Sequence, residues 1–197
     1  MNRKAIRIAA AISAALLLAN CSTATPQQPP LAGAKVGGPF ALTDKDGRTV
    51  RDSDFAGKYR LVYFGYTFCP DACPTDMAKL GQALKKLDKS DPALSAKLVP
   101  IFITVDPERD TPKVVGEFTA NFHPRMIGLT GSLDAIKQVA REYSVYFAKQ
   151  PPAPGGGYLV DHSRVIYLMG PKGEPIAPIT SDMSVDEIIE TIKRWAV

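Results

Sequence analysis

Residues 59–74 read YRLVYFGYTFCPDACP, and this stretch decides the fold. Its first eight residues, 59–66, are mostly β-branched, aromatic or Leu, which is typical of a strand buried in the centre of a sheet. Apolar residues then recur at steps of three and four, which predicts an amphipathic helix over 75–89; they are Met77, Leu80, Leu84 and Leu87. The sequence therefore places Cys69 and Cys73 between a central strand and the start of a helix.

Strand and helix patterns continue to alternate after this helix. Residues 98–105 form a second apolar strand, and Asp110, Thr111 and Pro112 supply a cap and a first-turn proline for the next helix. A short strand at 127–129 precedes another helical face. Strand, helix, strand and helix in this order begin a parallel α/β sheet.

The chain ends in a hairpin and a helix. Residues 164–169 and 174–179 flank a Gly-Pro-Lys-Gly turn, so we expect them to pair antiparallel. Ser184 and Glu187 form a capping box that opens the final helix. Another hairpin, over 40–50, precedes the first central strand. We therefore predict an α/β chain with a thioredoxin-like fold and an N-terminal β-hairpin extension.

The N-terminus resembles an export signal. Three basic residues precede an apolar run at 8–19, which is shorter than the roughly 20 residues needed to span a bilayer. Leu-Ala-Asn-Cys at 18–21 resembles a bacterial lipobox, although a small residue usually stands where Asn does, and predicts lipidation of Cys21. The alternatives are cleavage after Ala24 and an uncleaved anchor. Each places the domain outside the cytoplasm, and we expect the periplasmic face of a bacterial inner membrane.

The chain divides into three segments: an export signal at 1–20, a flexible tether at 21–38 and one domain at 39–197. The whole chain has 24 Lys and Arg against 20 Asp and Glu. Since three of the basic residues lie in the export signal, the domain is close to neutral. It lacks the broad basic surface that gives affinity for nucleic acid, so no nucleic-acid partner is expected.

The position of the cysteine pair favours reactive thiols. Outside the cytoplasm, thiols tend to form disulfides unless a metal or a reductant intervenes. Cys69 and Cys73 lie at or just before a helix N-terminus, which favours thiolate. Their i, i+4 spacing lets both side chains point at one small ion if the intervening residues form a helical turn. The alternative is a stabilising disulfide that closes a short loop.

The sequence departs from a thioredoxin-type oxidoreductase at two places. Three residues separate the cysteines instead of two, and no proline occurs between 159 and 169, where the fold ordinarily has a cis-proline. Asp-His-Ser at 161–163 stands there instead. Two thiolates and one imidazole favour copper, as Cu(I) or Cu(II), whereas a closed zinc site needs a fourth ligand. Cys69, Cys73 and His162 are thus candidate copper ligands; the alternative for His162 is a hydrogen bond to a carbonyl.

Three other polar residues are given roles from their positions. Asp161 adjoins His162 and could orient the imidazole or complete the coordination of Cu(II). Asp106 begins the segment 106–110, which ends the second strand at the edge where α/β sites assemble, so we expect it near the metal or a partner. The alternative for this segment is that Asp110, Thr111 and Pro112 simply start the next helix. His123 precedes a proline and is typical of a structural chain turn.

Several separated motifs resemble the Sco/SenC family of copper-binding assembly proteins for cytochrome c oxidase. In chain order they are YFGYTFCPDACP at 63–74, TVDPERDTP at 104–112, FHPR at 122–125, GLTG at 128–131 and VDHS at 160–163. The resemblance covers about residues 36–197. It implies Cys69, Cys73 and His162 as copper ligands. It also implies delivery of copper to the CuA site of oxidase subunit II, or reduction of the thiols in that site. Many members keep a membrane span, where this sequence has a lipobox-like end.

Two functional hypotheses follow. The first is a membrane-tethered copper metallochaperone, with the CuA domain of oxidase subunit II and periplasmic copper carriers or thiol reductants as partners. The second is a thiol-disulfide oxidoreductase that keeps the CuA-site cysteines reduced, with Cys69 and Cys73 as its only redox residues. Only the first requires His162. A copper-responsive redox sensor is a third hypothesis that the sequence neither supports nor excludes. A peroxidase is disfavoured because the Thr/Ser-x-x-Cys pattern is absent.

Overall fold

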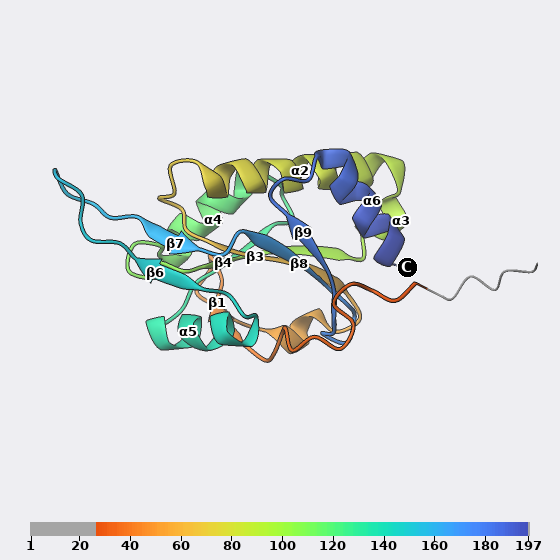
Figure 1. Cartoon of the computed structure of the whole chain (residues 1–197), viewed down its shortest axis with the longest axis horizontal. Coiled ribbons are helices and arrows are strands. Elements are labelled where there is room, and N and C mark those ends of the chain that lie inside the picture. Colours follow the sequence, from red (N-terminus) through yellow and green to blue (C-terminus); the bar gives the residue numbers. More distant parts are fainter. Residues whose placement is uncertain (1–26, 197) are drawn as a thin grey trace, which may run out of the picture.

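A five-stranded sheet runs through the centre of the structure, a computed structural model that describes residues 27–196 (Figure 1). In chain order the elements are β1 (Ala41–Thr43), β2 (Thr49–Arg51), the 3-10 helix η1 (Asp52–Phe55), β3 (Tyr59–Gly65), α2 (Ala72–Ser90), α3 (Pro92–Ser95), β4 (Leu98–Thr104), α4 (Pro112–Ala120), β5 (Ile127–Leu129), α5 (Leu133–Glu142), β6 (Phe147–Lys149), β7 (Val160–His162), β8 (Val165–Met169), β9 (Pro175–Thr180) and α6 (Val185–Trp195). The export signal and Cys21 lie outside the described residues.

The strand order is β5-β4-β3-β8-β9, so the strand before the cysteines is the middle one. β3, β4 and β5 are parallel, β8 runs antiparallel to β3, and β9 runs antiparallel to β8. Every residue of β3 is buried, because both faces of this strand are covered. The arrangement confirms the predicted α/β fold of thioredoxin-like type, including the β1–β2 hairpin ahead of the sheet.

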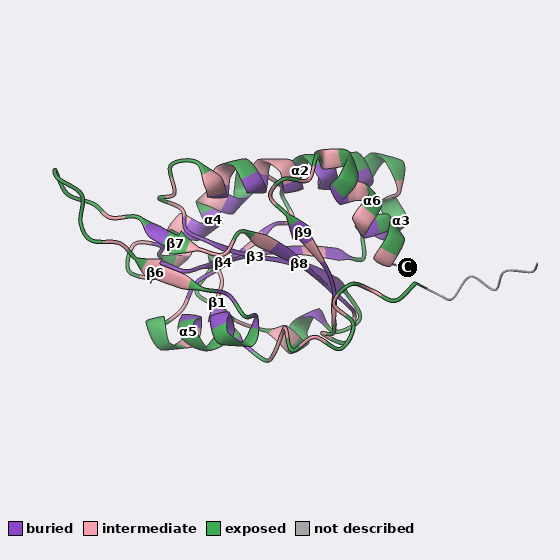
Figure 2. Cartoon of the chain, viewed as in Figure 1, coloured by how far each residue is buried: buried purple, intermediate pink, exposed green. Residues whose placement is uncertain are grey.

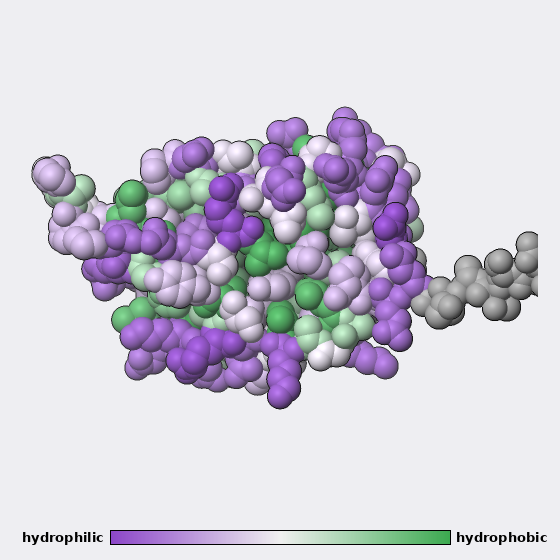
Figure 3. Space-filling model, in the orientation of Figure 1, coloured by the Kyte–Doolittle hydropathy of each residue, from purple (hydrophilic) through white to green (hydrophobic). Residues whose placement is uncertain are grey.

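Helices cover the two faces of the sheet unequally. α2, α4 and α6 lie on one face, and α5 lies on the other with the β1–β2 hairpin (Figure 1). Buried residues line the sides of the helices that face the sheet (Figure 2). The outer surface over α5 is hydrophilic, and apolar atoms are exposed between α5 and the helices of the opposite face (Figure 3). The sheet is therefore the middle of three layers.

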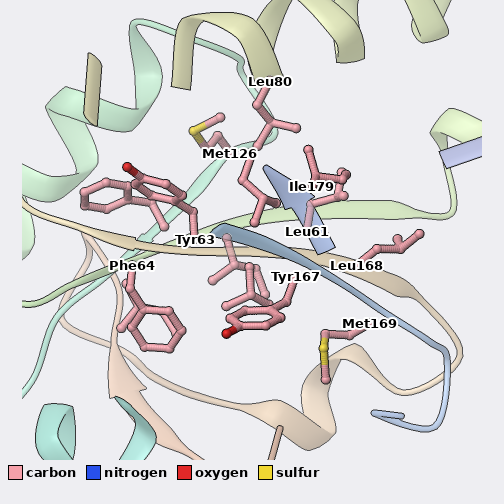
Figure 4. Packing of buried hydrophobic residues seen from close by; sticks show 14 of the residues in the cluster. Leu61, Tyr63, Phe64, Leu80, Met126, Tyr167, Leu168, Met169 and Ile179 are labelled. Atoms are coloured by element: carbon pink, nitrogen blue, oxygen red, sulfur yellow. The ribbon is translucent and has the colours of Figure 1, made fainter. Parts of the chain in front are cut away.

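Alternate residues of β3 form the two halves of the core. Tyr63 lies on the α2 side with Leu80, and Phe64 lies on the other side with Tyr167 (Figure 4). Phe64 packs against Tyr143 of α5, with ring centroids 5.3 Å apart. Burying a large apolar side chain contributes about 1.5–3 kcal/mol, so these contacts fix the strand between its two helical layers.

Helix α2 begins three residues earlier than the periodicity predicts. It starts at Ala72, so that Cys73 and Pro74 lie in its first turn. A proline is tolerated there because the first backbone N–H groups of a helix have no partner within the helix. The apolar repeat starts only at Met77 and gives no sign of this turn. The structure therefore places one cysteine before the helix and one inside it.

A small hairpin that the sequence pattern does not predict carries His162. β6 and β7 pair antiparallel, with Phe147 opposite His162, and the Pro/Gly loop at 151–157 connects them. Each strand has three residues, which is too short for an alternating pattern to be recognised. The short helices η1 and α3 were missed for the same reason.

Residues 31–38 differ from the predicted flexible tether, because they contact the domain. The Leu31 N–H donates to the Ile176 carbonyl at 3.0 Å, and the Gly37 N–H donates to the Glu142 carbonyl at 2.8 Å. The side chains of Leu31 and Val36 pack against the core. Isolated apolar residues have no period, so the pattern could not reveal this packing. Within residues 27–196 no helix has the length and apolar character that crossing a membrane requires.

Candidate metal centre

The loop after β3 and the first turn of α2 carry the cysteine pair. Both are free thiols; Cys73 is fully buried, whereas Cys69 is partly exposed. The Cys73 N–H donates to Cys69 Sγ at 3.4 Å, and the Tyr66 N–H donates to Cys73 Sγ at 3.5 Å. Gly65 leaves room for this arrangement, because a Cβ there would lie 2.8 Å from Cys73 Sγ. Backbone groups at the strand end and the helix start thus position both sulfur atoms.

His162 completes the cluster from the end of β7. Its Nε2 lies 3.3 Å from Cys73 Sγ, and its Nδ1 lies 3.0 Å from the Ser163 carbonyl. A carbonyl accepts only, so Nδ1 carries the proton and Nε2 keeps its lone pair towards the sulfur atoms. One ligand atom from each of Cys69, Cys73 and His162 lies within 4.8 Å of the others. The structure brings together the three residues that the sequence singles out.

Two tyrosine rings hold the imidazole edge-on. The centroid of the His162 ring lies 6.0 Å from that of Tyr63 and 5.9 Å from that of Tyr66, with interplanar angles of 85° and 89°. Aromatic rings prefer such edge-to-face contacts, which add to the energy of burial. The rings restrict the orientation of the imidazole.

Burial and hydrogen bonds give the three groups different protonation behaviour. Burial raises the pKa of the Cys73 thiol, and the neighbouring Cys69 raises it further. Burial also acts to raise the pKa of Cys69, but hydrogen bonds from the backbone N–H groups of Cys73 and Asp71 outweigh it and bring this pKa below its usual value. Burial lowers the pKa of His162 and keeps the imidazole neutral. The site therefore combines an accessible thiolate with a buried thiol and a neutral imidazole.

Asp76 and Arg164 form an ion pair that the sequence analysis does not predict. Asp76 is buried on α2 and accepts hydrogen bonds from the Tyr63 hydroxyl at 2.8 Å and from Arg164 Nη2, also at 2.8 Å. Asp76 follows Cys73 by three residues, and Arg164 follows His162 by two. The pair thus joins the two segments that carry the ligand atoms. An acidic residue on the apolar face of the predicted helix was the available signal.

The two aspartates assigned to the site do not contact it directly. Asp161 is exposed, and its carboxylate accepts a hydrogen bond from Gln150, so the expected contact with the imidazole is absent. The reason is that neighbouring residues on a strand point to opposite faces. Asp106 is buried and accepts hydrogen bonds from Arg109 and Tyr158. Its side chain is therefore linked to Arg109 and Tyr158, neither of which is a ligand residue.

His123 has the structural position that its sequence context predicts. It is buried in the turn before β5, where its Nε2 lies 2.9 Å from an Asp88 carboxylate oxygen. Its Nδ1 accepts the Arg125 N–H at 3.3 Å. These bonds tie the turn to the end of α2, and His123 is not a member of the cluster.

Comparison with known proteins places this cluster in a family. The sequence profile of SCO1/SenC matches residues 28–197. The chain belongs to the SCO1/SenC family. Among curated members of the family, the mitochondrial protein SCO1 homolog 1 of Arabidopsis thaliana is 42% identical over 173 residues, which are 88% of this chain and 51% of that protein. An SCO2-like protein of Rickettsia prowazekii is 37% identical over 182 residues, 88% of this chain and 86% of that protein.

The chain spans about half the length of the mitochondrial member and most of the bacterial one.

Solved structures of the family share the fold. A crystal structure of Arabidopsis thaliana ScoI with copper bound has a TM-score of 0.74 and 42% identity, and covers 81% of this chain and 97% of its own. BsSco, described as having a disulfide switch and as a member of the Sco family of cytochrome c oxidase assembly proteins, has a TM-score of 0.64 and 26% identity, with coverages of 85% and 97%.

Proposed function

We propose that the protein is a copper metallochaperone that binds one copper ion through Cys69, Cys73 and His162. The observation that carries the proposal is the meeting of two sulfur atoms and one imidazole nitrogen within 4.8 Å. Thiolates are soft ligands that select Cu(I), and imidazole suits copper in either oxidation state. The copper-bound structure of the Arabidopsis relative supports this assignment.

The client is the CuA centre of cytochrome c oxidase subunit II. Support comes from BsSco, which is described as belonging to a family of oxidase assembly proteins. Two thiolates hold Cu(I), and the imidazole adds the nitrogen ligand that Cu(II) prefers. Cys69 is the partly exposed ligand, so ligand exchange with a client thiolate begins at Cys69. Copper carriers of the same compartment are the expected donors.

A second function, thiol-disulfide exchange, is favoured by the difference between the two thiols. Cys69 is accessible and has a lowered pKa, and the buried Cys73 lies directly behind it. The Cys69 thiolate attacks a client disulfide and forms a mixed disulfide, releasing one client thiolate. Cys73, on losing its proton, then attacks Cys69 and releases the second client thiolate. Two client thiols are gained and the Cys69–Cys73 disulfide is formed, which a periplasmic thiol reductant must reduce.

The protein acts in the bacterial cell envelope, tethered by a lipid on Cys21 at the outer face of the inner membrane. This part of the proposal rests on the basic and apolar pattern of residues 1–20 and on Leu-Ala-Asn-Cys at 18–21. The relative in Rickettsia supports a bacterial setting. Tethering brings the protein onto the same surface as its membrane-bound client.

Anaerobic copper titration of the reduced protein tests the function. We expect one tightly bound Cu(I) per chain, lost in both Cys69→Ser and Cys73→Ser. Cys21→Ser is the matched control, since it removes a thiol outside the cluster, and should bind like the unmodified protein. Tight retention of one Cu(I) in Cys69→Ser would contradict the proposal.

His162→Ala separates the two functions. It should weaken the binding of Cu(II) much more than that of Cu(I), because two thiolates alone can hold Cu(I). It should leave the reduction of a client disulfide largely intact, because that reaction uses only the cysteines. Equal loss of both oxidation states would contradict the assigned role of His162.

A further inference from the structure

His162 is carried by a hairpin that does not belong to the central sheet. β6 and β7 pair only with each other among the described strands and form a separate two-stranded sheet. The hairpin extends away from the body of the molecule (Figure 1). A two-stranded hairpin is marginally stable by itself. Backbone pairing with the main sheet therefore does not hold the hairpin itself, so that, besides the short link from His162 to β8, side-chain contacts hold this ligand against the cysteines.

One such contact is a stack of aromatic rings around Arg109, in the loop after β4. The guanidinium carbon lies 3.7 Å from the ring centroid of Tyr158, 4.9 Å from that of Phe68 and 5.7 Å from that of Tyr66. Tyr158 belongs to the hairpin that carries His162, whereas Phe68 and Tyr66 belong to the cysteine loop. We call these four residues the Arg109 clasp.

Two hydrogen bonds to the buried carboxylate of Asp106 link the clasp to the end of β4. Asp106 accepts from Arg109 Nε at 2.5 Å and from the Tyr158 hydroxyl at 2.8 Å, so one buried carboxylate orients both partners. Beside it, Lys149 of β6 pairs with Glu108 at 2.5 Å and lies 3.9 Å from the Tyr158 ring centroid. β6 and the segment just before β7 are thus both held to the loop after β4.

The position of the Arg109 guanidinium between the rings leaves one of its nitrogen atoms without a hydrogen bond. Among the described residues, Arg109 Nη2 is one of two buried side-chain nitrogen atoms without a hydrogen-bond partner. An unsatisfied buried donor is unfavourable, and it persists only where other contacts fix its position. Among the ring contacts of Arg109, the one with Tyr158 is the closest. Arginine is suited to this task because its planar guanidinium stacks on aromatic faces.

We propose that Arg109 and Tyr158 are positioning residues, which hold the His162 hairpin over the cysteine loop and thereby set how tightly Cu(II) is retained. The inference rests on the proposed copper-binding function. Neither residue is within the ligand cluster. The clasp and the Arg164–Asp76 pair flank His162 in sequence, four residues before it and two after it. Without the clasp the hairpin is free to move, and the His162 imidazole lies farther from the two sulfur atoms. Cu(II) retention then falls, while Cu(I) stays on the two thiolates.

The test compares Tyr158→Leu and Arg109→Met with the unmodified protein, using the whole chain and copper itself as the probe. We expect each variant to bind Cu(II) about 10–100-fold more weakly, the range typical of residues that orient metal ligands. Cu(I) affinity should not change, and the absorption of the Cu(II)–thiolate bond should shift. Tyr158→Phe, which keeps the ring but loses the hydroxyl bond to Asp106, should recover most of the affinity.

Tyr146→Leu is the matched control, because Tyr146 lies at the base of the same hairpin, is 65% exposed and is outside the clasp. It should bind Cu(II) normally. Unfolding of the copper-free variants is measured in parallel, and if Tyr158→Leu does not fold, Arg109→Met carries the test. Unchanged Cu(II) binding in folded Tyr158→Leu or Arg109→Met, or equal loss of Cu(I) and Cu(II), overturns the inference. His162→Ala is the reference, since its failure to weaken Cu(II) binding would overturn the ligand assignment itself.

Discussion

Cys69 and Cys73 share one site but differ in chemistry. Cys69 is partly exposed and accepts hydrogen bonds from the N–H groups of Cys73 and Asp71, which stabilise its thiolate. Cys73 is fully buried, and burial stabilises its neutral thiol. The spacing of the residues in the sequence cannot distinguish the two, because the difference arises from where α2 begins. The Cys69 thiolate is therefore the nucleophile that attacks groups outside the protein.

Alkylation of the reduced, copper-free protein tests this difference. Iodoacetamide should modify Cys69 first, and its rate should level off at a lower pH than for an ordinary thiol of pKa about 8.5, because the Cys69 thiolate forms at lower pH. Peptide mass spectrometry over a pH series identifies the site. Cys73→Ser should react as fast as the unmodified protein and Cys69→Ser far more slowly. Faster modification of Cys73 would show that its thiol is not shielded.

At the scale of elements, Asp76 joins α2 to β3 and to the residue before β8. It accepts from the Tyr63 hydroxyl and from Arg164, whose side chain is partly exposed. Removing the carboxylate leaves the Tyr63 hydroxyl buried without this acceptor, which costs about 1–3 kcal/mol. Water can solvate Arg164. Asp76→Ala should thus lower the free energy of unfolding by about that amount.

Urea unfolding of the copper-free protein measures this change. The matched control is Asp186→Ala, which breaks the exposed pair with Lys86. Exposed pairs contribute about 0–1 kcal/mol, so the control should unfold near the midpoint of the unmodified protein. Equal midpoints for Asp76→Ala and the control would show that the buried pair does not stabilise the fold.

Long or strictly periodic elements could be predicted from the sequence, and short ones could not. β3 and the apolar face of α2 were recognised because a buried run and a helical repeat each extend over many residues. β6 and β7 have three residues each and leave no pattern, so the setting of His162 was missed although the residue itself was identified. The Arg109 clasp joins three segments distant in sequence. Local periodicity carries no information about such contacts.

At the scale of the whole molecule, the proposed copper site lies on a thioredoxin-like domain, and Cys21 precedes this domain in the sequence. If Cys21 carries acyl chains, they hold the protein more firmly than a single chain could. Confining the protein and its membrane-bound client to one membrane surface raises their effective concentration towards each other. Cys21→Ser should release the domain from the membrane, leave its purified copper affinity unchanged and impair oxidase assembly most at low copper.

Cell fractionation and oxidase activity at two copper concentrations measure these effects. The purified Cys21→Ser protein provides the control for copper affinity. Cys21→Ser protein that stays in the membrane with its leader uncut would indicate an uncleaved anchor instead of a lipid.

X-ray absorption at the copper edge tests the central claim most directly, because it reports the atoms bound to the metal. The protein loaded with Cu(II) should show two sulfur ligands and an imidazole nitrogen, with one sulfur lost in Cys69→Ser and the imidazole lost in His162→Ala. A copper ion surrounded only by nitrogen and oxygen atoms, or a spectrum that none of these substitutions alters, would contradict the site formed by Cys69, Cys73 and His162.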